Sequence, residues 1–358
     1  MHDEALRLLR ELTEAHSVPG HEEEVREIFV REMAGRGGIT GDRSGSVACE
    51  FGEGPRVLLA GHMDEVGFLV QAITADGFLR FVPLGGWWAH TLPAQRVVVR
   101  TAGGRKVPGV IGAQPPHLLS EAQSRQVMEI EQMFIDVGAG SRQQVEHELG
   151  IRVGDPVAPW SPFTPLAPGG MLMAKAFDNR VGMAAAIQAG GMLADLPGPN
   201  RLLVAGTVQE EMGLRGARTL ARVTRPDVAV VLEGPPADDT PGFPGGEAQG
   251  RLGGGVQIRM FDPSAIMNPL LARLAIEVAE QEKIPHQVSV RRKGGTDAGM
   301  IHLSGDGVPC VVLGVPARYI HSHNAIIDVN DYLQMVALAV ALVRRLDAPT
   351  VAAIGGMA

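Results

Sequence analysis

The chain has 358 residues, 45% of them hydrophobic and 20% charged, which is typical of a globular protein that buries a sizeable core. At roughly 100–200 residues per domain, this length indicates two domains, or one large domain with an insertion. The net charge is −8 and the sequence has no dense block of Lys or Arg, so neither nucleic acid nor a membrane surface is expected as a partner.

The cysteines and the first residues predict a cytoplasmic protein. Cys49 and Cys310 are far apart and flanked by apolar residues, so we expect buried free thiols and a reducing compartment. Residues 1–17 predict a charged amphipathic helix, whereas a signal peptide needs an unbroken apolar stretch. The late apolar stretch Met335–Val343 ends at two arginines and is shorter than the roughly 18–20 residues of a membrane span.

The first part of the chain predicts two helices, one strand and then a strand-dense block. A Val-Pro-Gly break at residues 18–20 separates the helices, and the second begins near His21 with a Glu-rich first turn that suits the helix dipole. Arg56–Ala60 predicts a short buried strand. Further strands are expected at 68–73, 78–82, 95–101, 106–111 and 133–137, the first four as two hairpins around Gly-containing turns. Residues 67–165 therefore predict a small β-rich domain.

After residue 165, apolar strands alternate with helices. The expected strands are 202–208, 228–232, 255–260, 286–291 and 309–315, and the expected helices are 178–196, 214–223, 269–283 and 329–346. This order predicts an α/β fold, in which helices cover both faces of one sheet. We expect residues 1–66 and 166–358 to form a single domain, with the β-rich domain 67–165 inserted near its first strand.

Five short segments carry metal-competent side chains, most of them at or just beyond the end of an expected strand, where open α/β sheets collect ligands and catalytic groups. The side chains are His62 with Asp64, Asp178, Glu210 with Glu211, Glu233, and His321 with His323. Their mixture of imidazole and carboxylate groups suits zinc or another borderline divalent ion. Two such ions roughly 3.5–4 Å apart, sharing a carboxylate, form the usual two-metal hydrolase site.

Each segment also has a plainer interpretation. His62 and the 321–323 pair can be ordinary polar loop residues, and Asp178, which opens an expected helix, can be an N-cap. Glu210 and Glu211 can be a solvated pair. Burying two unpaired carboxylates is costly, however, so we expect these glutamates to have different functions, one as a metal ligand and one as an unbound base.

The segments resemble a known family. AGHMDEVGFLV, KAFDNRVG, TVQEEMGLRGA, VLEG followed by ADDTPG, GGTDAG and ARYIHSHNAII are similar to the tetrahedral-aminopeptidase family of co-catalytic zinc peptidases, which includes glutamyl and deblocking aminopeptidases. The similarity runs over nearly the whole chain, in order. It implies a zinc-exopeptidase-like mixed sheet, and an inserted β domain through which subunits dimerise and can assemble into a dodecamer. PPHLL at residues 115–119 also resembles the family, but His117 receives no catalytic role.

The resemblance implies a ligand set for two divalent ions per subunit. Asp178 matches the carboxylate that bridges both ions. His62 and Glu233 match the other ligands of one ion, and Glu211 and His321 match those of the second. The family often has Asp where this chain has Glu233, and the longer side chain could change metal preference. Zinc is the expected metal, although cobalt and manganese also suit these ligands.

The remaining matches concern the reaction. Glu210 matches the general base and Asp64 the residue that orients His62. The implied reaction removes N-terminal residues from peptides with a metal-activated water. We expect Asp297, in GGTDAG, near the substrate's amino group, with a turn-forming Asp as the alternative.

Three rival classes fit part of the pattern. A metal-dependent deacylase or carboxypeptidase of the same clan would share the metals and the base, but needs a cation that grips a substrate carboxylate. A non-catalytic, metal-stabilised assembly scaffold would need ligands but no free base, and the pair of adjacent glutamates argues against it. An endoglucanase needs two carboxylates that straddle a glycosidic bond, for which Glu210 and Glu211 are poorly placed. The sequence leaves open the preferred N-terminal residue.

Overall fold

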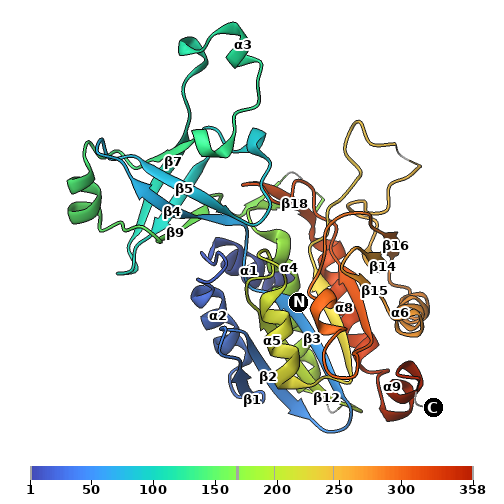
Figure 1. Cartoon of the computed structure of the whole chain (residues 1–358). Coiled ribbons are helices and arrows are strands. Elements are labelled where there is room, and N and C mark those ends of the chain that lie inside the picture. Colours follow the sequence, from blue (N-terminus) through green and yellow to red (C-terminus); the bar gives the residue numbers. More distant parts are fainter. Residues whose placement is uncertain (1, 167–168, 197, 245, 357–358) are drawn as a thin grey trace.

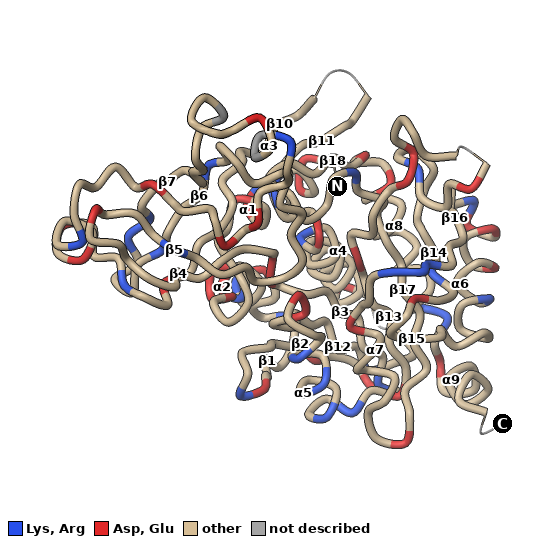
Figure 2. The backbone as a smooth tube through the Cα atoms, turned by 45° about the horizontal axis from the view of Figure 1, so that its top comes forward, with Lys and Arg blue, Asp and Glu red and all other residues tan. Residues whose placement is uncertain are grey.

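The computed structural model describes residues 2–166, 169–196, 198–244 and 246–356. A large mixed sheet with helices on both faces forms one part of the molecule, and a closed β-barrel stands beside it (Figure 1). Acidic and basic residues are interspersed over both parts (Figure 2). The expected fold class is confirmed.

The N-terminal region largely follows the sequence pattern. The helices α1 (His2–Glu14) and α2 (Glu23–Met33) lie on either side of the expected break. Between α2 and β3 (Arg56–His62) the structure adds β1 (Gly38–Gly41) and β2 (Val47–Gly52), an antiparallel pair that we did not predict. All four residues of β1 are exposed, so its sequence carries no alternation of apolar and polar residues.

The large sheet has the order β1-β2-β12-β3-β13-β17-β14-β15, with β16 beside β14. Its later strands are β12 (Arg201–Thr207), β13 (Val228–Glu233), β14 (Val256–Asp262), β15 (Ala265–Ile266), β16 (His286–Val290) and β17 (Cys310–Gly314). Strands β12, β3, β13 and β17 are parallel, so their carboxyl ends meet at one edge of the sheet. This edge carries most of the side chains singled out from the sequence.

Helices cover both faces of this sheet. They are α4 (Phe177–Ala194), α5 (Arg215–Thr224), α6 (Pro269–Gln281), α7 (Ala298–Ile301), α8 (Val329–Val343) and α9 (Ala348–Ile354). Leu59 packs in the core shared with α1, α2, α4, α6 and α8, whereas its neighbour Leu58 packs in the core shared with α5 and α7. Cys49 and Cys310 are buried free thiols, as expected. Within the described residues, no helix combines the length and apolar character of a membrane span.

The barrel closes in the order β4-β5-β8-β7-β6-β9. Its strands are β4 (Gly67–Ile73), β5 (Leu79–Leu84), β6 (Arg96–Arg100), β7 (Lys106–Gly112), β8 (Phe134–Asp136) and β9 (Pro156–Pro159). The predicted hairpins are present as β4–β5 and β6–β7. We missed β9, since its sequence Pro-Val-Ala-Pro does not resemble an ordinary strand. The division into two domains and the dimerising function of the barrel remain predictions.

Short helical turns connect the barrel strands. They are η1 (Ala89–Thr91), η2 (Pro116–Leu118), α3 (Glu121–Ser124), η3 (Ile130–Gln132) and η4 (Gln144–Leu149). Helix α3 lies at the tip of a long loop that extends away from the barrel (Figure 1). His117, for which the sequence suggested no catalytic role, is an exposed residue of this loop.

A small third sheet joins two segments that are distant in sequence. It consists of β10 (Thr164–Pro165), β11 (Met171–Ala174) and β18 (Ala325–Asp328). In the antiparallel pairing of β11 with β18, Ala174 lies opposite Ala325. The ladder therefore brings the segment that leads to Asp178 beside the segment that follows His321.

Glycines allow α4 to pack closely against β3. A Cβ atom on Gly61 of β3 would lie 2.8 Å from the carbonyl carbon of Gly182 and 2.9 Å from the backbone nitrogen of Met183, so a side chain there would displace α4. Asn179 ties the start of α4 to β13, because its Nδ2 donates to the carbonyl of Leu232 at 2.8 Å. This packing sets the distance between the end of β3 and the start of α4.

Replacing Gly61 tests this packing. Gly61→Ala is expected to lower the free energy of unfolding by about 1–3 kcal/mol, because the added methyl group must push α4 away from β3. Gly38→Ala in β1 is the matched control, since a Cβ atom there meets nothing within 4 Å. Urea denaturation of both variants measures the difference. Equal stabilities of the two variants would show that α4 is not held at this distance by Gly61.

Candidate active site

The predicted metal ligands converge at the carboxyl edge of the parallel strands. His62 ends β3 and Glu233 ends β13, while Glu211 closely follows β12. Asp178 lies at the start of α4, and His321 lies in the loop before β18. Most of these positions follow from the sheet topology, which is why an expected strand end was a useful guide in the sequence.

Asp178 lies between the two histidines. Its Oδ1 is 3.2 Å from Nε2 of His62, and its Oδ2 is 3.5 Å from Nε2 of His321. The helical part of α4 begins after the non-helical residues 178 and 179, and Asn179 caps it, because its Oδ1 accepts from the backbone N–H of Gly182 at 3.0 Å. Burial opposes ionisation, but the imidazoles of His321 and His62 lower the pKa of Asp178 below its usual value. A carboxylate whose two oxygens face different imidazoles is suited to bridging two cations.

The glutamates complete two sets of potential ligands. In His62, Glu210 and Glu233, and again in His62, Asp178 and Glu211, one ligand atom from each residue lies within 4.8 Å of the others. Nε2 of His62 is 3.8 Å from Oε2 of Glu210 and 3.8 Å from Oε2 of Glu233. These sets differ from those implied by the resemblance, because Glu210 joins one of them. The separation of ligands from base therefore remains a prediction.

His321 is placed by an unusual backbone. Its φ is +54°, so the chain is not extended here and His321 does not share a face with His323. The Nδ1 of His321 is 2.7 Å from the carbonyl oxygen of Gly86, which directs Nε2 towards Oε1 of Glu211 at 3.4 Å. His323 is instead buried beside Trp87, with 5.7 Å between the ring centroids. Of the two histidines, the structure brings only His321 to the ligand cluster.

Asp64 connects β3 to the loop that carries the glutamates. Its Oδ1 accepts from the backbone N–H of Glu210 at 2.9 Å, and its Oδ2 accepts from that of Glu211 at 3.0 Å. Nδ1 of His62 is 3.0 Å from the backbone oxygen of Asp64 and 3.5 Å from Oδ1. Asp64 is thus in contact with His62, as expected, and it also holds the glutamate loop. The sequence offered no sign of this second contact.

A buried ion cluster lies beneath the site. Nζ of Lys175 donates to both carboxylate oxygens of Glu65, at 2.6 and 2.8 Å, and Nη2 of Arg180 donates to Oε1 at 3.0 Å. Burial lowers the pKa of Lys175 to about 8, although Glu65 opposes this shift. Because Glu65 follows Asp64 while Lys175 and Arg180 flank Asp178, the cluster fastens the two ligand segments together. The sequence analysis did not single out these three charged residues.

Asp297 lies in the protein interior beside the acidic cluster. It is fully buried and accepts a hydrogen bond from the hydroxyl of Thr207, while its Oδ1 has no partner within the described residues. Burial raises its pKa to about 6. Its neighbour Thr296 lines a cavity that lies beside the metal-competent residues and is described below, whereas Asp297 does not line it. A contact of Asp297 with the substrate's amino group remains a prediction.

The site concentrates more negative charge than its imidazoles can balance. Burial raises the pKa of Glu210 and Glu233 well above the usual value, and raises that of Glu211 to about 7. Burial would lower the pKa of the histidines, but the surrounding carboxylates raise it, in His321 to about 9. Oε1 of Glu233 is buried without a partner in the described chain. Oxygen and nitrogen ligands in such an acidic cluster fit divalent cations.

A cavity of about 480 Å³ opens beside this cluster. Asp178, Glu210, Glu211, Glu233 and His321 line one part of it. Its wall also includes the cationic side chains of Arg259 and Lys293. The cavity wall therefore combines acidic groups, suited to metal ions, with basic groups, suited to an anionic group of a ligand.

Known proteins match this chain over nearly its whole length. The family described as M42 glutamyl aminopeptidase matches residues 45–338, and a second family, AMPT, matches residues 3–29. The glutamyl aminopeptidase of Lactococcus lactis subsp. cremoris is 38% identical over 97% of this chain and 98% of its own.

Two solved structures are also similar. The TET aminopeptidase of a marine sediment Thaumarchaeota archaeon is 42% identical, with a TM-score of 0.95 over 98% of this chain and 99% of the other. The Pyrococcus horikoshii TET1 peptidase, which can assemble into a tetrahedron or a large octahedral shell, is 33% identical, with a TM-score of 0.85 over 96% of this chain and 100% of the other.

The fold, the acidic site and these similarities define a peptide hydrolase of the aminopeptidase class. The chain belongs to the M42 glutamyl aminopeptidase family. The resemblance drawn from the sequence motifs is confirmed, and membership of this metallo-aminopeptidase family implies the use of divalent metal ions.

The pKa shifts predict how the metal-free protein responds to pH. Glu211 titrates near 4.5 when unfolded and about 7 when folded, so its stabilising proton is lost as the pH rises through this interval. His321, raised from 6.5 to about 9, acts in the same direction. After chelation, the melting temperature should fall as the pH rises from 6.5 to 8, because the histidines with lowered pKa values act only below this interval and Lys175 only above it. Added zinc should reverse the fall. Thermal denaturation measures this, and a melting temperature that rises over the interval would contradict it.

Proposed function

We propose that this chain is a two-metal aminopeptidase in which Asp178 bridges both ions. His62 and Glu233 complete the ligands of one ion, and Glu211 and His321 complete those of the other. The observation that carries the proposal is the position of Asp178, whose two oxygens face His62 and His321 separately at 3.2 and 3.5 Å. We infer zinc as the metal, with cobalt or manganese as substitutes.

When bound, the ions supply a Lewis acid for the scissile carbonyl and bring the pKa of a water towards about 7. Glu210 then accepts the proton of the attacking water and passes it to the leaving amine. Its raised pKa, caused by burial and by neighbouring carboxylates, suits a group that must take up a proton and release it again near neutral pH. Asp64 holds the backbone of Glu210 during this transfer.

Replacing Glu210 and Glu211 by glutamine one at a time distinguishes the proposed general base from the proposed metal ligand. Glu210→Gln should keep its metal but lose at least about 10²-fold in kcat, the usual range for a general base. Glu211→Gln, the same change one residue further on, should lower the metal content as well as the rate. Elemental analysis and steady-state kinetics measure both properties. Near-normal turnover in Glu210→Gln would remove Glu210 from this function.

We also propose a preference for acidic N-terminal residues, because the basic side chains of Arg259 and Lys293 line the cavity. Arg259 is buried and pairs with Asp262 at 3.1 Å, whereas Lys293 forms no ion pair with any residue that the structure describes. A glutamyl or aspartyl side chain would supply a carboxylate for Lys293. A deacylase would need such a cation too, but family membership favours a side-chain carboxylate of a peptide.

Removing or reversing the charge of Lys293 tests this preference. Lys293→Ala should lower kcat/KM for glutamyl p-nitroanilide roughly tenfold or more, because a hydrogen bond to a charged group contributes about 1.5–3 kcal/mol. Leucyl p-nitroanilide should be little affected, and Lys293→Glu should favour lysyl substrates. Arg292→Ala is the control, since this exposed neighbour does not line the cavity. Equal losses on glutamyl and leucyl substrates would contradict the preference, and faster hydrolysis of N-acetyl-glutamate would favour a deacylase.

We further propose that the chain forms homo-oligomers through dimers, with a dodecamer as the larger assembly. The support is the similarity to a peptidase that can assemble into a tetrahedron. The exposed Trp88 and Val153 near the barrel strands fit an interface of this kind. A cytoplasmic location remains a prediction.

A further inference from the structure

Glu22 stands at the N-cap position of α2 but does not cap it. A side chain at this position commonly accepts a hydrogen bond from an N–H of its own helix, and no such bond is present here. The side chain is buried, with 6% of its surface exposed. Burying a carboxylate is unfavourable unless it has other partners, so its contacts need an explanation.

The carboxylate of Glu22 reaches the loop that carries Glu210. Its Oε1 accepts from the backbone N–H of Gln209 at 3.1 Å and from that of Gly20 at 2.8 Å. Gln209 has a φ of +54°, a left-handed conformation that is costly for a residue other than glycine. Backbone hydrogen bonds from the start of α5 hold this turn on one side, and Glu22 binds it from outside the segment.

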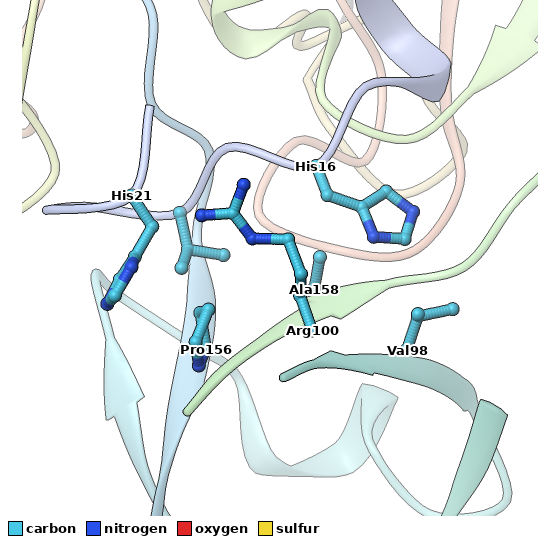
Figure 3. Close-up of a pocket in the computed structure, with 7 residues that line it drawn as sticks. His16, His21, Val98, Arg100, Pro156 and Ala158 are labelled. Carbon is cyan, nitrogen blue, oxygen red and sulfur yellow. The ribbon is translucent and has the colours of Figure 1, made fainter. Parts of the chain in front are cut away.

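Glu23 and Glu24, which follow Glu22 in the first turn of α2, contact the barrel instead. Oε2 of Glu23 accepts from Nη2 of Arg100 at 2.6 Å, and Oε2 of Glu24 accepts from Nζ of Lys106 at 2.9 Å. Figure 3 shows Arg100 beside the small cavity between the barrel and the chain segment that carries His16 and His21. The start of α2 is thus fastened to the barrel on one side and to the glutamate loop on the other.

We propose that Glu22 is a positioning residue for the catalytic loop. Its carboxylate accepts from the backbone N–H of Gln209 in the left-handed turn, and the carboxylate of Asp64 accepts from those of Glu210 and Glu211. Three successive backbone N–H groups of this loop are therefore fixed, which sets the direction in which the side chains of Glu210 and Glu211 enter the site. The inference rests on the proposed function of Glu210. It adds that the start of α2 sets the position of the base although Glu22 does not line the cavity.

The energetic argument favours a hydrogen-bonding function over a packing function. Glu22 lies close to Asp64, and burial together with this like charge raises its pKa to about 7. A hydrophobic side chain in the same place would avoid this cost. The carboxylate is therefore explained by the N–H groups that it accepts, of which Gln209 belongs to the catalytic loop.

Two neutral variants of similar side-chain length, of which only one carries an oxygen that accepts a hydrogen bond, test the proposal. Glu22→Met keeps the length of the side chain but accepts poorly, and its kcat should fall about ten- to hundredfold, as small misplacements of catalytic groups do. KM should change less than kcat, because Glu22 does not line the cavity. Metal content is measured in every variant, since the proposed ligand Glu211 lies on the same loop as Glu210. Glu22→Gln retains an accepting oxygen and should restore most of the turnover. Each variant is assayed as the full-length, metal-loaded enzyme.

Two further variants control the experiment. Glu23→Met makes the same change one residue on and removes only the barrel contact, so its kcat should stay near wild type. Glu22→Asp keeps the charge on a shorter side chain and should lose turnover, which provides the test if Glu22→Met does not fold. Equal kcat in Glu22→Met and Glu23→Met would overturn the proposal, as would a Glu22→Gln enzyme as slow as Glu22→Met. An active Glu210→Gln enzyme would instead show that Glu210 is not the general base. The comparison between the Glu22 and Glu23 variants could still be interpreted in that case.

Discussion

The crowding of carboxylates around two imidazoles is the constraint on which the rest of this structure depends. Asp64, Asp178, Glu210, Glu211 and Glu233 converge on His62 and His321, and the buried charges would repel one another if the protein carried no compensating groups. Hydrogen bonds from backbone N–H groups and imidazoles offset part of this repulsion. Bound divalent cations would offset the remainder. The stability of the fold and the proposed catalytic function therefore depend on the same cluster of side chains.

The backbone arrangement that makes this cluster possible has few parts. The close approach at Gly61 and Gly182 sets the spacing between β3 and α4, which brings His62 to Asp178. The ladder of β11 with β18 aligns the chain on either side of the site, and the ion cluster of Glu65 joins the two ligand segments. Each of these contacts acts on the distance between the proposed ligands, and none of them is made by a ligating atom.

The barrel also takes part in the site. Gly86, which follows β5, accepts the hydrogen bond that orients His321. Its neighbour Gly85 has a φ of +82°, and a Cβ atom there would lie 2.6 Å from Cγ1 of Val66 and 3.1 Å from Oε2 of Glu211. A side chain at this position would strain the backbone and displace these neighbours.

The amino-acid sequence by itself determined the alternation of strands and helices, the barrel hairpins and the identity of the acidic and imidazole residues that converge. These depend on local patterns and on strand ends, which the order of residues displays directly. Only the tertiary structure decided that Asp64 and Glu22 hold the loop before Glu210, that Glu65 joins two segments, and that His323 is buried beside Trp87. These contacts join residues far apart in the chain, through backbone groups and left-handed turns, and no local periodicity reports such pairings.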